Sequence, residues 1–167
     1  DVFSDMAGNC ACSFNPTANE GGVYKVSVVH PDIVERPAQG QFVINSLVVS
    51  PTLYKLNNLR NYPYTFKLRT KAGPGTIANN VRVVYDAVAQ PSGALPAGIT
   101  LTTGAPIALG SSQSGDIAVT ITGDNNAPTS GSLYLKVMAD EKGTQPVATV
   151  QVNYVFTDGK PSIFPSP

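Results

Sequence analysis

Three runs in the C-terminal third of the chain place an apolar residue at every second position. The runs are Ile117, Val119 and Ile121; Leu133, Leu135 and Val137; and Val150, Val152, Tyr154 and Phe156. A period of two brings such side chains onto one face of a strand, whereas a helix would spread them around its axis. Segments rich in turn-forming residues, 123–131 and 140–146, separate the runs. We therefore predict that residues 114–156 form an antiparallel meander with one apolar face.

The rest of the chain also favours short strands. Further strands are expected at residues 23–29, 40–50, 64–69, 81–88, 99–103 and 107–109. The nearly continuous apolar run in 40–50 predicts a strand that is buried on both faces or is covered by a neighbouring subunit. Residues 51–63 are less regular, and Leu53, Leu56, Leu59 and Arg60 have the spacing of a single helical turn.

Short strands separated by frequent turn signals predict an all-β fold. The expected architecture is a single β-sandwich of immunoglobulin-like or jelly-roll type, with a closed barrel as the alternative. A chain of 167 residues is long enough for one such domain. We divide it into an irregular N-terminal arm (1–21), the β-sandwich domain (22–159) and a proline-rich C-terminal tail (160–167).

The charge pattern limits the classes of partner. Only 13% of the residues are charged, against about 25% in typical domains. Eleven basic and eleven acidic residues cancel, and they form no long run of one sign. Binding to nucleic acid is therefore not expected. Insertion into a membrane is not expected either, because no apolar run approaches the roughly 20 residues of a membrane helix.

The supply of residues for catalysis is small. His30 is the single histidine, and the sequence contains neither a Gly-x-Ser-x-Gly motif nor a phosphate-binding loop. Residues 124–126 (Asp-Asn-Asn) lack the spacing of a calcium loop and are typical of a turn. We expect no enzyme, no catalytic residue, no cofactor and no metal site.

Two cysteines, Cys10 and Cys12, are separated by one residue. Two thiolates supply half of a tetrahedral zinc site, and the spacing differs from the redox motif Cys-x-x-Cys. Three states remain: an intrachain disulfide, which we place first although so short a spacing disfavours it, a bond between subunits, and free thiols.

The N-terminal arm carries apolar side chains at Val2, Phe3, Met6 and Phe14. Such side chains prefer burial. We predict that they dock the arm on its own domain or on the next subunit, and we name them as an assembly arm.

Three tyrosines, Tyr54, Tyr62 and Tyr64, lie close to several asparagines in the sequence. Tyrosines at alternating strand positions usually pack in the core or across strands. The alternative is an exposed patch on which a sugar ring stacks, although the absence of tryptophan weakens this reading. We keep the three residues as a candidate ligand patch.

The chain begins at Asp1 rather than at a methionine. We expect a mature, secreted form from which a signal peptide has been removed, and therefore a location outside the cell or at its surface. The low charge and the Ser- and Thr-rich strands agree with this expectation.

Residues 127–137, Ala-Pro-Thr-Ser-Gly-Ser-Leu-Tyr-Leu-Lys-Val, place a Pro-x-x-Gly turn before an alternating strand. This segment resembles the penultimate strand of immunoglobulin-like extracellular modules and of fimbrial surface-fibre subunits. The resemblance implies donor-strand assembly, in which a terminal arm completes the sheet of a neighbour.

The sequence thus predicts a secreted structural subunit that binds copies of itself. The N-terminal arm and the edge strands would join these copies into an extracellular filament or surface array. The alternatives are a monomeric extracellular module for adhesion or glycan binding, whose partner is a glycan or a surface receptor, and a virion coat or decoration protein.

Overall fold

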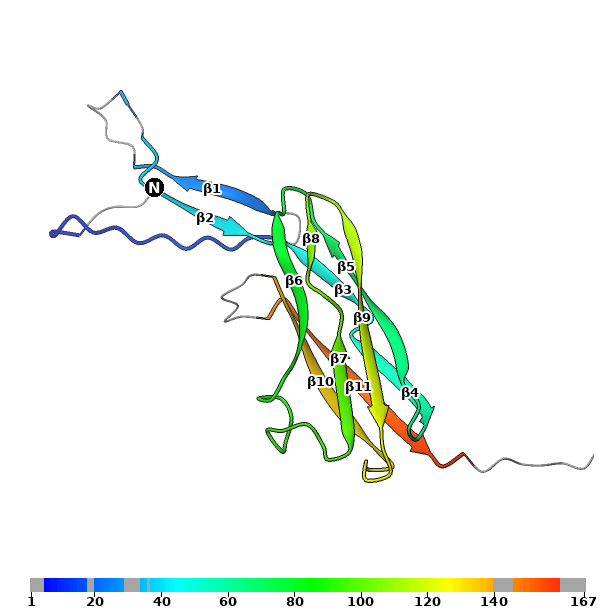
Figure 1. Ribbon diagram of the computed structural model, residues 1–167. Coiled ribbons are helices and arrows are strands. Elements are labelled where there is room, and N and C mark those ends of the chain that lie inside the picture. Colours follow the sequence, from blue (N-terminus) through cyan, green and yellow to red (C-terminus); the bar gives the residue numbers. More distant parts are fainter. Residues whose placement is uncertain (1–4, 18–19, 29–33, 36, 140–145, 160–167) are drawn as a thin grey trace, which may run out of the picture.

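The computed structural model describes residues 5–17, 20–28, 34–35, 37–139 and 146–159. These residues form strands and loops, which confirms the all-β prediction (Figure 1). The described strands are β1 (Gly22–Val26), β2 (Gly40–Ile44), β3 (Leu47–Ser50), β4 (Leu53–Leu59), β5 (Tyr64–Ala72), β6 (Ala78–Tyr85), β7 (Ile99–Thr103), β8 (Ile107–Leu109), β9 (Ser114–Gly123), β10 (Ser130–Met138) and β11 (Ala148–Thr157).

Strands β3 to β11 form a sandwich of two sheets. One sheet has the order β3-β5-β9-β7, and the other has the order β4-β11-β10-β6-β8. In an immunoglobulin constant-type domain the sheets contain strands A-B-E-D and C-F-G. The orders β3-β5-β9-β7 and β6-β10-β11 reproduce this arrangement, so the fold is an immunoglobulin-like sandwich.

The core lies between the two sheets and is filled by the alternating residues identified in the sequence. The side chains of Leu133, Leu135, Val137, Val150, Val152 and Phe156 are all 0% exposed, as are Val119 and Ile121 on the opposite sheet. At Gly123 an added Cβ would lie 2.5 Å from the Phe156 ring. Close packing at this end of β9 therefore requires glycine.

The predicted meander over residues 114–156 is wrong in one respect. Strands β10 and β11 pair antiparallel as expected, but β9 pairs with β5 and β7 in the other sheet. Each of these strands has one apolar face, and two facing layers bury that face better than one continuous sheet can. The segment 124–129 therefore crosses from one sheet to the other.

Two predictions for residues 40–60 are also wrong. The expected strand 40–50 divides at residues 45–46 into β2 and β3, because the backbone of Ser46 bonds to Gly73 and Thr76 instead of continuing a ladder. Within this chain Val43 and Val48 are 54% and 61% exposed, so the run is not buried on both faces. The expected helical turn near Leu56 is strand β4, which pairs parallel with β11.

The first two strands lie outside the sandwich. Strands β1 and β2 pair antiparallel in a two-stranded sheet of their own. In Figure 1 this hairpin projects beyond one end of the sandwich, and residues from the N-terminal arm run beside it. The sandwich is therefore complete without residues 22–44.

We expect Leu135→Ala to lower the free energy of unfolding by about 2–5 kcal/mol, because it leaves a cavity between the sheets. Leu53→Ala is the matched control, since Leu53 is 51% exposed on β4, and it should cost less than about 1 kcal/mol. Urea unfolding followed by circular dichroism measures both. Equal losses would contradict the assignment of the core.

Candidate interaction surface at the N-terminal extension

The described residues from 5 to 44 form what we call the N-terminal extension, which consists of the arm and the β1–β2 hairpin. Among them no side chain is buried, and the core begins at Val49. A hairpin without further strands or a packed face is marginally stable in water. The extension therefore has apolar surface that this chain does not cover.

Three aromatic rings hold the arm against one face of the hairpin. Tyr24 and Phe42 are partners in the β1–β2 register, and their rings stack with centroids 5.5 Å apart. Phe14 from the arm contacts both rings, at 5.5 Å from Tyr24 and 5.9 Å from Phe42. Such aromatic contacts each contribute about 0.5–1.5 kcal/mol beyond their area. The arm thus lies on the hairpin of its own chain.

The other face of the hairpin is open. Val23 and Val43 are register partners there, and they are 52% and 54% exposed. On the opposite face, which carries Tyr24, Val26 at the end of β1 is also 44% exposed. Apolar side chains gathered in this way mark a contact surface in many proteins.

Backbone contacts attach the root of the extension to the sandwich. The Ser46 N–H donates to Thr76 Oγ1 at 3.0 Å, and Thr76 Oγ1 donates to the Ser46 carbonyl at 3.1 Å. The Gly73 N–H donates to the same carbonyl at 2.8 Å. Gly21 and Gly75 approach so closely that a Cβ on either would overlap the other segment. These contacts fix the direction in which the hairpin leaves the sandwich.

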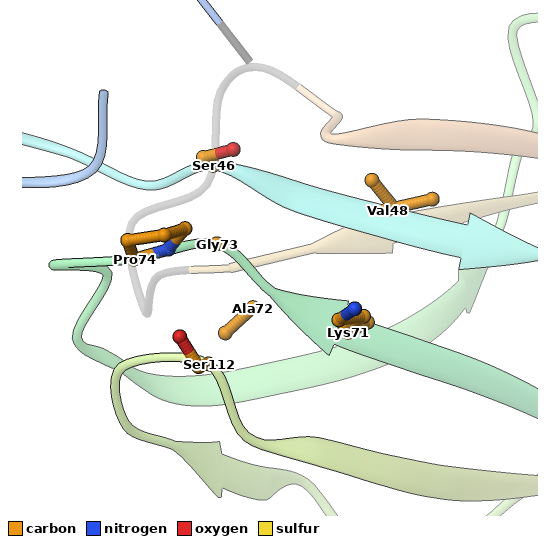
Figure 2. A pocket seen from close by; sticks show the side chains of 7 residues that line it. All are labelled: Ser46, Val48, Lys71, Ala72, Gly73, Pro74 and Ser112. Carbon is orange, nitrogen blue, oxygen red and sulfur yellow. The ribbon is translucent and has the colours of Figure 1, made fainter. Parts of the chain in front are cut away.

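One edge of a sandwich sheet lies next to this root. Strand β3 forms one edge of its sheet, contains no charged residue and has Val48 61% exposed. A cavity of about 410 Å³ lies beside it, lined by Ser46, Val48, Lys71, Ala72, Gly73, Pro74 and Ser112 (Figure 2). Lys71 is the only ionisable side chain in this lining, so the cavity lacks an acid–base pair for catalysis.

The assembly arm is described only in part. Met6 and Phe14 are 108% and 49% exposed, and Phe14 contacts the hairpin. Val2 and Phe3 lie outside the described residues, as do His30 and the tail 160–167. The role of these four apolar residues in assembly stays a prediction.

Both cysteines are free and exposed. The intrachain disulfide that we placed first is therefore not present in the structure. In an extended segment the Cα atoms of residues i and i+2 are about 6.6 Å apart, at the upper end of the range for a disulfide. Cys10 and Cys12 remain available for bonds to another chain.

The structure separates the three tyrosines of the candidate ligand patch. The hydroxyls of Tyr54 and Tyr64 lie 3.0 Å apart, and the Tyr54 ring stacks on Phe66 with centroids 4.2 Å apart. Both tyrosines are half-buried against the core, whereas Tyr62 is 63% exposed. The hydrogen bond to Tyr64 raises the pKa of Tyr54, and partial burial of Tyr54 raises it further by a smaller amount.

Tyr62 lines a cavity of about 420 Å³ together with Arg60, Asn61, Asn125, Asp158 and Gly159. Arg60 has a structural role there. Its Nη1 donates to the carbonyls of Asp124 and Ala127 at 2.9 and 2.6 Å, and its Nε lies 2.9 Å from Asp158 Oδ1. Arg60 therefore stabilises the segment 124–129, which connects β9 to β10.

No group of three His, Cys, Asp or Glu residues among the described residues is arranged to hold a metal ion. The same part of the chain contains no helix with the length and hydropathy needed to cross a membrane.

Comparison with known proteins found no matching family model and no matching curated protein. Several solved structures are similar in fold. A PapD-like (ASH) domain of human CEP192 aligns at 11% identity and a TM-score of 0.48, over 82% of this chain and 99% of that one.

Two further structures are similar over part of the chain. A family 123 glycoside hydrolase from Clostridium perfringens aligns at 11% identity and a TM-score of 0.42, over 64% of this chain but 23% of the hydrolase. A protein from Porphyromonas gingivalis W83 aligns at 10% identity and a TM-score of 0.41, over 84% of this chain and 68% of that one. These likenesses concern the fold alone.

We expect the sandwich to lose stability above about pH 10, because burial raises the pKa of Tyr154, which is 2% exposed. The folded state binds the phenolic proton more tightly, so this stabilisation is complete below the unfolded pKa and is lost as the pH rises through the folded pKa. Tyr154→Phe should reduce the loss. Urea midpoints at pH 8 and pH 10.5 test this, and an unchanged loss would contradict it.

We also expect oxidised glutathione to link copies through Cys10 and Cys12 by thiol–disulfide exchange. Two accessible thiols per chain should give a ladder on non-reducing electrophoresis, and Cys12→Ser should stop the ladder at the dimer. A reductant should return every band to the monomer. A monomer band in all lanes before reduction would reject linkage between subunits.

Proposed function

We propose that this protein is a structural subunit that assembles with copies of itself into an extracellular filament or surface array. The N-terminal extension and the free sheet edges would form the contacts between copies. The proposal needs no catalytic residue, cofactor or metal ion.

The observation that carries the proposal is the uncovered apolar surface of the extension. Val23 and Val43 on one face of the hairpin, and Phe14 and Met6 on the arm, are all at least 49% exposed. At about 25 cal/mol per Å², covering even a few such side chains contributes several kcal/mol to association. A projecting hairpin can reach a neighbour that the compact sandwich alone cannot (Figure 1).

Unpaired backbone groups support the same proposal. Among the described residues, 10–16 belong to no helix or strand and take part in no hydrogen bond. Strand β3 offers a free edge in the same chain. Backbone groups of these kinds can be satisfied by adding a strand to a sheet edge.

Deletion of residues 1–21 should abolish assembly and leave the sandwich folded, because the core begins at Val49. Negative-stain microscopy would show filaments or arrays for the full chain and isolated particles for the truncated chain. The control is deletion of residues 160–167, which should leave assembly intact. Unchanged polymers after deletion of residues 1–21 would reject the role of the arm.

The open face of the hairpin can be tested without truncation. Val23→Ser combined with Val43→Ser should slow assembly at least tenfold, because the pair loses its apolar contact area. Val88→Ser is the control, since Val88 is 91% exposed in a loop of the sandwich. Light scattering gives the assembly rate of each variant. Equal rates for the double variant and the control would remove the hairpin from the interface.

A further inference from the structure

Residues 1–44 and residues 45–167 carry net charges of opposite sign, which cancel over the whole chain. Residues 1–44 contain five acidic residues and two basic ones, so their formal charge is −3. Residues 45–167 contain nine basic residues and six acidic ones, so their formal charge is +3. Opposite charge on two parts of one chain attracts the extension of one copy to the sandwich of another.

Three of the nine basic residues in this part of the chain lie on one strand. Lys67, Arg69 and Lys71 alternate along β5 with buried residues, so all three point outward and are exposed. Side chains at this spacing lie about 6.6 Å apart along the strand. We call these three residues the basic stripe.

The neighbours of the basic stripe compensate little of its charge. On β3, Val48 and Ser50 are the register partners of Lys71 and Arg69, and on β9 the partner of Arg69 is Asp116. Ion pairs between described residues join Arg60 to Asp158 and Lys136 to Asp86, and none involves the stripe. The three exposed cations of the stripe thus have one carboxylate, that of Asp116, among their register partners. The exposed side chain of Val48 lies beside Lys71.

We infer that the basic stripe, together with the β3 edge at Val48, receives the acidic N-terminal extension of a second copy. This inference rests on the proposed function and names the surface that the extension would contact. The surface combines positive charge with an apolar edge and with the cavity beside Lys71 and Val48 (Figure 2). The extension offers the matching features, namely exposed apolar side chains and the exposed carboxylates of Asp5 and Glu35.

The extension of the same chain reaches only one end of this surface, where Pro16, Thr17 and Ile44 line a cavity of about 420 Å³ with Leu47 and Val48. Val48 is still 61% exposed there, and the basic stripe is exposed along β5. The root at Ser46 directs the hairpin beyond the end of the sandwich (Figure 1). The exposed carboxyl group of Asp5 accepts hydrogen bonds from the N–H groups of Asn9 and Ala7, and these bonds lower its pKa. Its charge is therefore available to another copy.

A single reversal of charge tests the stripe. Arg69→Glu should slow assembly about tenfold or more at low salt, because complementary charges mainly raise the rate of association. Lys55→Glu is the matched control: it changes the net charge by the same amount on β4, in the other sheet, and should change the rate less than twofold. For the unaltered chain, sodium chloride at about 0.5 M should slow assembly, because it shortens the Debye length to a few ångströms.

A charge exchange tests the pairing of the two surfaces. One variant carries Lys67→Glu, Arg69→Glu and Lys71→Glu, and the other carries Asp5→Lys and Glu35→Lys. Each variant alone has like charges on its extension and its stripe and should stay monomeric. Their mixture restores opposite charges at every contact and should assemble, with the two variants alternating. Circular dichroism and the thermal midpoint of each variant verify that the sandwich is folded.

The outcomes separate this inference from the proposed function. If the full chain assembles but Arg69→Glu and Lys55→Glu behave alike, or if the folded mixture stays monomeric, the stripe is not the acceptor, and self-assembly still stands. If the full chain remains monomeric at every concentration and salt, the proposed function fails, and this inference fails with it. Assembly of the mixture, with each variant monomeric by itself, would support the pairing of the extension with the basic stripe.

Discussion

The structure depends on the dry contact between two sheets whose inward side chains alternate along every long strand. Phe66 and Leu68 from one sheet and Leu133 and Leu135 from the other belong to this contact, and all are 5% exposed or less. Because it is complete from Val49 onward, the fold does not require the N-terminal extension for its core. Within the extension Phe14, Tyr24 and Phe42 pack on one another, whereas Val23 and Val43 stay exposed and are free to contact another surface.

The contacts that attach the extension to the sandwich restrict the direction of the hairpin. A flexible linker would allow the hairpin many directions, but the bonds between Ser46 and Thr76 and the close approach of Gly21 to Gly75 allow few. Restricting the hairpin in advance lowers the entropy that a partner must remove on binding. Rigid attachment and uncovered apolar surface together favour a specific contact over a nonspecific one.

Much of the fold follows from local pattern, because a period of two determines which face of a strand is buried. The alternation in β5, β9, β10 and β11 identified the core residues, and the strand order of the sandwich agrees with the immunoglobulin-like prediction. Pattern alone does not tell which sheet a strand joins, so it predicts neither the pairing of β9 with β5 and β7 nor the break at residues 45–46. A charge count over the whole chain averages opposite regions to zero and therefore does not reveal the basic stripe, whereas the alternation of Lys67, Arg69 and Lys71 with buried residues along β5 does.

The extension and the sheet that carries Val48 are different surfaces of one molecule. A contact between them has no two-fold axis and is heterologous, so it joins subunits head to tail into an open polymer or a ring. An open polymer built in this way has two different ends. The terminal subunit at one end has a hairpin with no partner, and the terminal subunit at the other end has a sandwich surface with no partner. Growth and capping would then differ between the two ends of the polymer, although every subunit is identical.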